Sequence, residues 1–112
     1  MLRITVLNDP EGTRFKLEGK LAQAWVREAE KAWVALSAIN GKKKVIVDLF
    51  GVTFVDDFGR QLLTEMCHAG AELVGSGPMM AALIEQIEEA ETARIEEEPG
   101  TMRSMTLEEL AQ

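Results

Sequence analysis

Cysteine, tyrosine and proline are scarce in this chain of 112 residues, which has one cysteine, no tyrosine and three prolines. A single cysteine, Cys67, excludes an internal disulfide and favours a reducing, cytoplasmic location. No apolar run approaches the roughly 18 residues that a membrane-spanning helix needs. The first residues alternate like a strand and do not form a basic and then apolar leader. We therefore expect neither a membrane span nor a signal peptide.

Basic residues are scarce in the second half of the chain. Residues 57–112 carry 12 acidic and 3 basic side chains, and the whole chain has a net charge of −7. Domains that bind nucleic acid present a basic face to its phosphates. We therefore expect no nucleic-acid partner.

Alternating and helical spacings of apolar residues organise the first 40 residues. The period of two predicts a hairpin of strands 2–7 and 13–18, joined by a turn and ended at Gly19. Helical spacing predicts a helix over residues 20–38. Its predicted buried face includes Trp25, which we interpret as a large core residue in preference to a ligand-stacking one. The other members of that face are Leu21, Ala29, Ala32 and Leu36, and it is broadened by Ala22, Val26 and the second tryptophan, Trp33.

The middle of the chain continues the alternation of strands and helices. Residues 45–47 are β-branched and predict a central strand, followed by a short turn and a second apolar patch. A helix is expected to follow Asp57, and residues 72–74 predict another short strand. Pro78 suits the first position of a further helix. The order predicts a mixed α/β sheet of about four to five strands with helices packed on it, in one domain over residues 1–112.

The last 20 residues leave two alternatives open. Residues 93–95 fit either an edge strand or the end of a helix. Residues 96–100 are rich in glutamate and predict an acidic loop. Residues 106–109 fit a capping box, threonine followed three residues later by glutamate, which predicts a short helix over 106–111.

The acidic pair Asp56–Asp57 is the leading candidate for a functional site, because it opens a helix at the end of a strand. Such strand ends carry ligand and partner sites in open α/β sheets. At least one of the two carboxylates is expected to cap the helix by accepting N–H bonds. The pair has no histidine or third carboxylate at a suitable spacing, so we expect no metal.

Catalytic motifs are not apparent, so we expect a protein that is not an enzyme and has no cofactor. Cys67 and His68 are adjacent on the expected helix and point in different directions, which argues against a dyad. Residues Gly75, Ser76 and Gly77 precede Pro78, and such a turn either cradles an anion or is an ordinary tight turn. No Walker lysine follows them, so ATPase chemistry is not supported.

Four segments together resemble a STAS domain, the domain of sulfate transporters and anti-sigma-factor antagonists. They are residues 17–21, 45–56 and 70–74, together with Gly59. The resemblance spans about residues 2–90. It implies a SpoIIAA-like fold, a small mixed sheet with helices on one face. It also implies a bacterial, cytoplasmic module that binds a protein, in the antagonist branch an anti-sigma factor or kinase-like regulator.

The family's phosphorylation switch is missing from this chain. The resemblance aligns Asp56 and Gly59 with the ends of an Asp-Ser-Ser-Gly motif, in which a serine is phosphorylated. Here Asp57 and Phe58 replace the two serines, so no hydroxyl can take up phosphate. We therefore expect a protein-binding module without the switch, which contacts its partner through residues 56–60: Asp56, Asp57, Phe58, Gly59 and Arg60. For Phe58 itself two alternatives are open, an exposed apolar contact or a side chain folded back into the core. The alternative is a domain that binds a small ligand, a nucleotide or lipid, at Gly75, Ser76 and Gly77, or an accessory subunit of a larger assembly.

Overall fold

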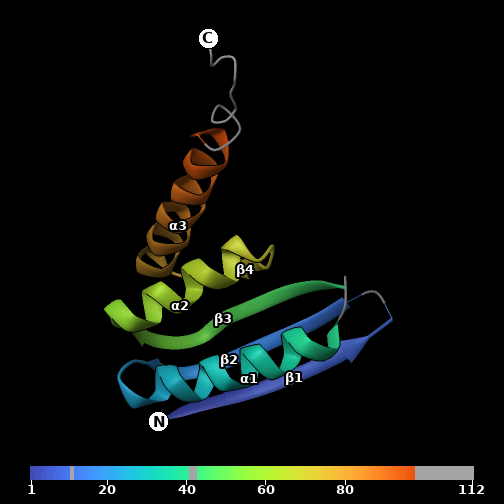
Figure 1. The fold of residues 1–112 in the computed structure, drawn as a ribbon. Coiled ribbons are helices and arrows are strands. Elements are labelled where there is room, and N and C mark those ends of the chain that lie inside the picture. The colour runs from blue at the N-terminus through green and yellow to red at the C-terminus, as the bar shows by residue number, and fades with distance from the viewer. Residues whose placement is uncertain (11, 41–42, 98–112) are drawn as a thin grey trace.

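The computed structural model describes residues 1–10, 12–40 and 43–97 (Figure 1). Four strands and three helices follow one another in the order β-β-α-β-α-β-α in this described part. Their bounds are β1 Leu2–Asp9, β2 Gly12–Leu21, α1 Ala24–Asn40, β3 Lys44–Val55, α2 Asp57–His68, β4 Glu72–Val74 and α3 Pro78–Glu97. The predicted mixed α/β class is confirmed.

The sheet has the strand order β1-β2-β3-β4. β1 and β2 form the predicted antiparallel hairpin, whereas β2–β3 and β3–β4 are parallel pairs. Both hairpin strands are longer than predicted. Gly19 was expected to end the second strand, but β2 continues to Leu21 through irregular pairing with β3. Gly19 has a φ of 109°, a conformation that glycine adopts without steric cost.

β3 is one continuous strand of 12 residues, so the short turn predicted after residues 45–47 is wrong. Gly51 lies within the strand and pairs with Glu18 of β2. Irregular pairing near this point lets the strand bend instead of ending. Because the strand is continuous, the second apolar patch lies in the same strand as the first.

Helix α1 begins at Ala24, later than predicted, and this shift changes its buried face. Val26, Ala29 and Leu36 are buried, whereas Trp25 is 41% exposed. The prediction that Trp25 is buried is therefore wrong. Ala29 and Leu36 fit both a stripe through Trp25 and a stripe through Val26, so spacing alone did not choose between them.

The second tryptophan of α1, Trp33, contributes to the core. It packs edge-on against Phe15 of β2, with ring centroids 5.8 Å apart and planes at 76°. Phe15 is fully buried. The core-filling role predicted for both tryptophans of this helix is thus confirmed for Trp33 alone.

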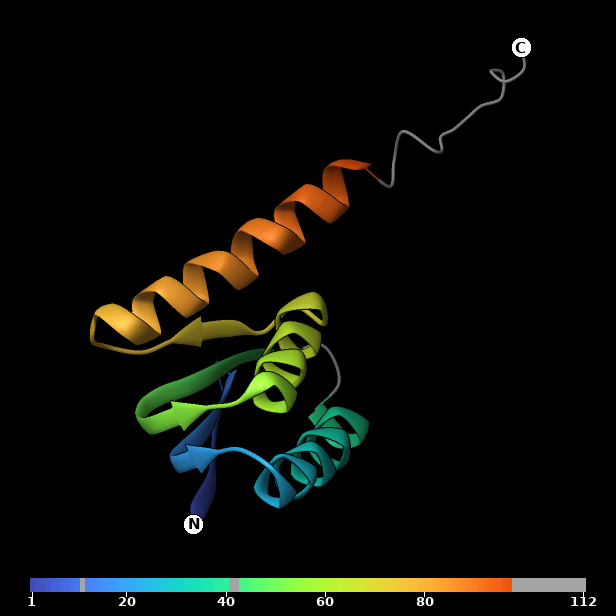
Figure 2. The same ribbon diagram turned by 90° about the vertical axis from the view of Figure 1, so that its left-hand side faces the viewer.

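Figure 2 shows α1 and α2 on one side of the sheet, with α3 crossing beside β4. The buried residues of β2 and β3 face α1 and α2. α3 packs chiefly against α2 and contributes Ile87, which is 2% exposed. The core therefore lies between the sheet and its helices, and it leaves the opposite face of the sheet open.

The end of α3 settles one of the alternatives for the C-terminal region. Residues 93–95 continue the helix and form no edge strand. Glu96 and Glu97 also belong to α3, so the predicted acidic loop is wrong at those two residues. Residues 98–100 and the predicted helix 106–111 lie outside the described residues.

Candidate functional site

Asp56 connects the first turn of α2 with the corner between β2 and α1. Its Oδ1 accepts a hydrogen bond from the Gly59 backbone N–H, and its Oδ2 accepts one from the Gln23 backbone N–H, both at 2.8 Å. Its own N–H donates to the carbonyl of Leu21 at 3.2 Å. The N–H groups of Gly59 and Gln23 lower the pKa of the Asp56 carboxyl below its ordinary value of 3.8. The predicted helix cap is confirmed and is Asp56.

Gln23 shows why this corner needs the Asp56 carboxylate. Its φ is +53°, and it is the one residue other than glycine with a positive φ in the described chain. This left-handed conformation is sterically costly for a residue with a Cβ. The hydrogen bond from its N–H to Asp56 compensates part of that cost. Asp56 therefore links the turn between β2 and α1 to the first turn of α2.

Three exposed aromatic side chains lie close in the sequence to the two residues of this hydrogen-bonded junction. Trp25, Phe54 and Phe58 are 41%, 49% and 64% exposed. Each lies two residues from Gln23 or Asp56, the residues joined by the 2.8 Å hydrogen bond. Half of the chain's six aromatic residues are therefore exposed at the carboxyl ends of β2 and β3. We call these three residues the aromatic patch.

The five predicted partner-binding residues have different environments. Phe58 is well exposed, so the alternative that it folds back into the core is wrong. Asp57 is exposed in the first turn of α2, and Arg60 is exposed one turn further on. Gly59 is buried, and a Cβ there would collide with the carbonyl oxygen of Leu21. Gly59 thus lets α2 approach β2 closely, which positions Phe58 beside the end of β3.

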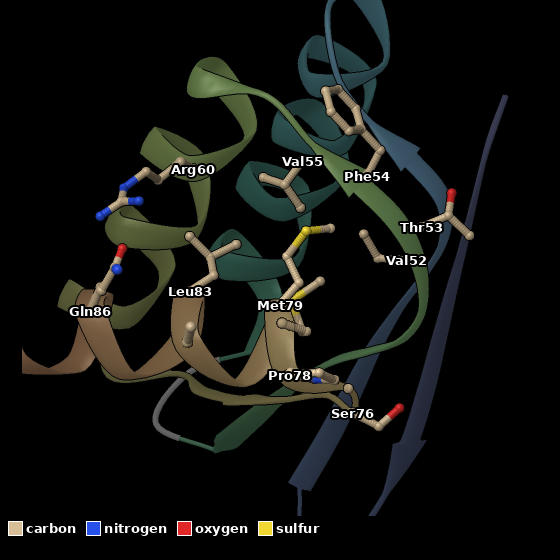
Figure 3. A pocket seen from close by; sticks show the side chains of 13 residues that line it. Val52, Thr53, Phe54, Val55, Arg60, Ser76, Pro78, Met79, Leu83 and Gln86 are labelled. Atoms are coloured by element: carbon tan, nitrogen blue, oxygen red, sulfur yellow. The ribbon is translucent and has the colours of Figure 1, made fainter.

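A groove of about 520 Å³ lies between the second half of β3 and the first turns of α3 (Figure 3). Ser76 and Gly77, two of the three predicted ligand-binding residues, line it. Gly75 is half-buried below it, where a Cβ would meet the Met80 side chain. The turn before α3 therefore borders a cavity.

The side chains considered for catalysis form other contacts. Burial raises the pKa of the Cys67 thiol, which makes it a poorer nucleophile at neutral pH. Nδ1 of His68, at the end of α2, lies 3.0 Å from a carboxylate oxygen of Glu91 on α3. No group of three His, Cys, Asp or Glu side chains in the described residues is arranged to hold a metal ion. In the same part of the chain, no helix is long and apolar enough to cross a membrane.

Sequence reasoning missed Trp25 and Phe54 as neighbours of the candidate site. Trp25 was assigned to the core because two helical stripes fit the same residues. Phe54 belongs to the second apolar patch of the sequence, and its apolar character did not reveal that it is 49% exposed. Gln23 gave no signal, because glutamine is not a residue that a left-handed conformation favours.

Comparisons with known proteins give a likeness in fold. No family model matches the sequence, and no curated protein matches it at a significant level. A similar solved structure is that of an uncharacterized protein from the DUF3478 family with a SpoIIAA-like fold, from Shewanella loihica PV-4. The two chains are 18% identical, the TM-score is 0.44, and the match covers 70% of this chain and 71% of the other.

Proposed function

We propose that this protein is a non-enzymatic module that binds another protein through the aromatic patch. The observation that carries the proposal is the exposure of Trp25, Phe54 and Phe58 around one hydrogen-bonded junction. Aromatic residues are enriched in the centres of protein interfaces, where they bury a large area with little loss of side-chain freedom. Exposed apolar surface marks an interaction site when it is contiguous, and the proposal is that these three side chains form such a surface.

Charges beside the patch indicate how a partner would be oriented. Asp57 is exposed next to Phe58, and Arg60 follows on α2. Asp56 is engaged by two backbone N–H groups, so it supports the surface more than it contacts a partner. A partner with a basic residue beside an apolar pocket would match Asp57 and Phe58 together.

The proposed regulatory role differs from the serine switch of STAS domains. The resemblance implies an anti-sigma-factor or kinase-like regulator as the partner and a bacterial cytoplasm as the location. With Asp57 and Phe58 in place of the two serines, phosphorylation at the helix start would not release such a partner. We propose that binding here is constitutive and is controlled by the amount of either protein.

Matched variants in a binding assay test the proposal. Immobilised wild-type protein, Phe58→Ala and Trp25→Ala would be exposed to a bacterial lysate, and each retained protein would then be purified and its affinity measured by calorimetry. Ile39→Ala is the control, because Ile39 is an exposed apolar residue on α1 about 21 Å from Trp25. We expect both patch variants to weaken binding at least tenfold and the control to leave it unchanged. Equal affinity of all four proteins for every purified partner would refute the proposal.

A further inference from the structure

The groove between β3 and α3 is lined mainly by apolar side chains. Val52 and Val55 come from β3, while Met80 and Leu83 come from α3, and all four are half-buried. Figure 3 shows Val52 and Val55 on the side of β3 and Leu83 on the side of α3. Met79 also lines the groove and is 75% exposed, which places it at the mouth. β3 pairs with β4 only at Ile46–Asp48, so in the described chain no strand covers this wall. The walls therefore leave apolar surface in contact with water that a bound apolar chain would cover.

The charge of the groove is unusual for so acidic a protein. Arg60 is the one charged residue among the described residues that line it, although the chain has 19 acidic side chains. Its guanidinium makes no ion pair with any residue in the described ranges. Figure 3 shows Arg60 and Gln86 at one end of the groove and Ser76 at the other. A single positive charge thus lies at one end of an otherwise apolar groove.

The size and polarity of the groove narrow the class of ligand. Its volume of about 520 Å³ falls within the range of small-molecule sites. A nucleotide carries a polar base and two or more negative charges, whereas this lining offers one cation and mostly apolar walls. Of the two predicted ligand classes, nucleotide and lipid, the lining favours the apolar one.

We propose that the groove binds an amphiphile with one aliphatic chain and one negative charge, such as a fatty-acid carboxylate. The chain would lie between Val52 and Val55 on one wall and Met80 and Leu83 on the other. The carboxylate would pair with the Arg60 guanidinium, whose planar fork matches its two oxygens. The groove borders the aromatic patch at Phe54, but the proposal does not require a protein partner.

Titration with decanoate and with decan-1-ol tests the two halves of the proposal. Binding would be measured by calorimetry and by amide chemical-shift changes, with both probes below their aggregation concentrations. We expect Arg60→Met to weaken decanoate binding at least tenfold and to leave decanol binding unchanged. Met79→Glu, which places an acid at the mouth of the groove, should weaken both. Arg27→Met and Val34→Glu, exposed positions on α1, are the matched controls and should change neither.

Three outcomes would overturn the proposal. They are no binding of decanoate by the wild type, equal binding by Arg60→Met, and chemical-shift changes that map away from β3 and α3.

Vesicles of neutral lipid that contain some anionic lipid distinguish a free amphiphile from a membrane surface. We expect no co-sedimentation with them, and co-sedimentation lost in Arg60→Met would instead assign the arginine to a bilayer. Phe58→Ala should retain decanoate binding, so failure of this proposal and failure of the protein-binding proposal are separable.

Discussion

The two halves of β3 serve different purposes. At Ile46–Asp48 the strand has neighbours on both sides, and Val45, Val47 and Leu49 of this half are buried. Beyond Asp48 it pairs with β2 alone within the described chain, and Phe50 and Phe54 are exposed. Burial of Val45, Val47 and Leu49 in the core makes the first half a source of stability. The second half keeps its apolar side chains available, and both proposed sites lie against it.

The largest effect expected from this contrast is on the stability of the first half. Leu49→Ala should lower the free energy of unfolding by about 2–5 kcal/mol, because Leu49 is 1% exposed in the packed core. Phe54→Ala removes a larger side chain but should cost less than about 1.5 kcal/mol, since Phe54 is 49% exposed. Urea unfolding of both variants measures the difference. Equal losses would show that the two halves of β3 contribute alike to the core.

A buried carboxylate near the middle of β3 gives the next largest effect. Asp48 is 6% exposed, accepts a 2.8 Å hydrogen bond from Nη1 of Arg14, and accepts another at 3.0 Å from the Phe50 N–H. Asp48→Ala should cost about 1–3 kcal/mol, because both donors lose their acceptor. Asp48→Asn keeps one acceptor oxygen and should cost less. Chemical denaturation of the two variants tests this order, and a reversed order would remove the buried acceptor as the cause.

Most of the fold was predictable because its apolar periods are regular. The hairpin, the helix after Asp57, the strand Glu72–Val74 and the helix from Pro78 all follow local patterns that tertiary packing supports. The continuity of β3 was not predictable from such patterns. Gly51 and its neighbours read as a turn, and only pairing with β2 keeps them in a strand.

The candidate site was predictable in part, and the limits have physical causes. Asp56 was identified as a cap because its position before a helix has a local chemical meaning. Its second bond, to Gln23, joins residues 33 positions apart, and no local pattern reports such a contact. The groove likewise forms between β3 and α3, two elements that α2 and β4 separate in the sequence. Contacts between residues far apart in the sequence therefore determine which groups lie next to Asp56 and Asp57.

Asp56 follows the second half of β3, and its replacement should have a moderate effect on stability. Asp56→Ala should lower the melting temperature by several degrees, because Gln23 and Gly59 both lose their acceptor. The folded state lowers the pKa of this carboxyl, so its charge contributes stability above about 3.8, the ordinary value. That contribution is lost as the pH falls through 3.8 towards the lowered pKa.

Melting curves between about pH 2.5 and 6 measure the acid-dependent part of this contribution. Asp56→Asn is the matched variant, since its amide accepts a hydrogen bond but carries no charge. The wild type should be the more stable protein at pH 6, and the difference should shrink below about pH 4. A difference that does not vary with pH would show that the charge of Asp56 is not what stabilises the junction.

Trp25 lies in the first turn of α1 and should contribute little to stability. Trp25→Ala should cost no more than about 1 kcal/mol, because the side chain is 41% exposed and outside the buried stripe of α1. Acrylamide quenching gives an independent measure. With Trp33→Phe the remaining Trp25 should be quenched readily, and with Trp25→Phe the remaining Trp33, packed on Phe15, should be shielded. Similar quenching of both would contradict the exposure of Trp25.

The smallest effect on stability is expected just beyond the end of β3, where the missing switch can be restored. Asp57→Ser combined with Phe58→Ser recreates the Asp-Ser-Ser-Gly motif of the family that the chain resembles. Both side chains are exposed and Asp56 keeps the helix cap, so the melting temperature should change by only a few degrees. The new hydroxyls should then accept phosphate from a serine kinase that acts on STAS domains, as peptide mass mapping would detect. Because residues 55–60 of the wild type contain no hydroxyl, the wild type should remain unmodified there.

Unfolding of the double variant would place Phe58 in the core. A folded variant that the kinase ignores would show that the surface around α2 differs from that of the family in more than two side chains.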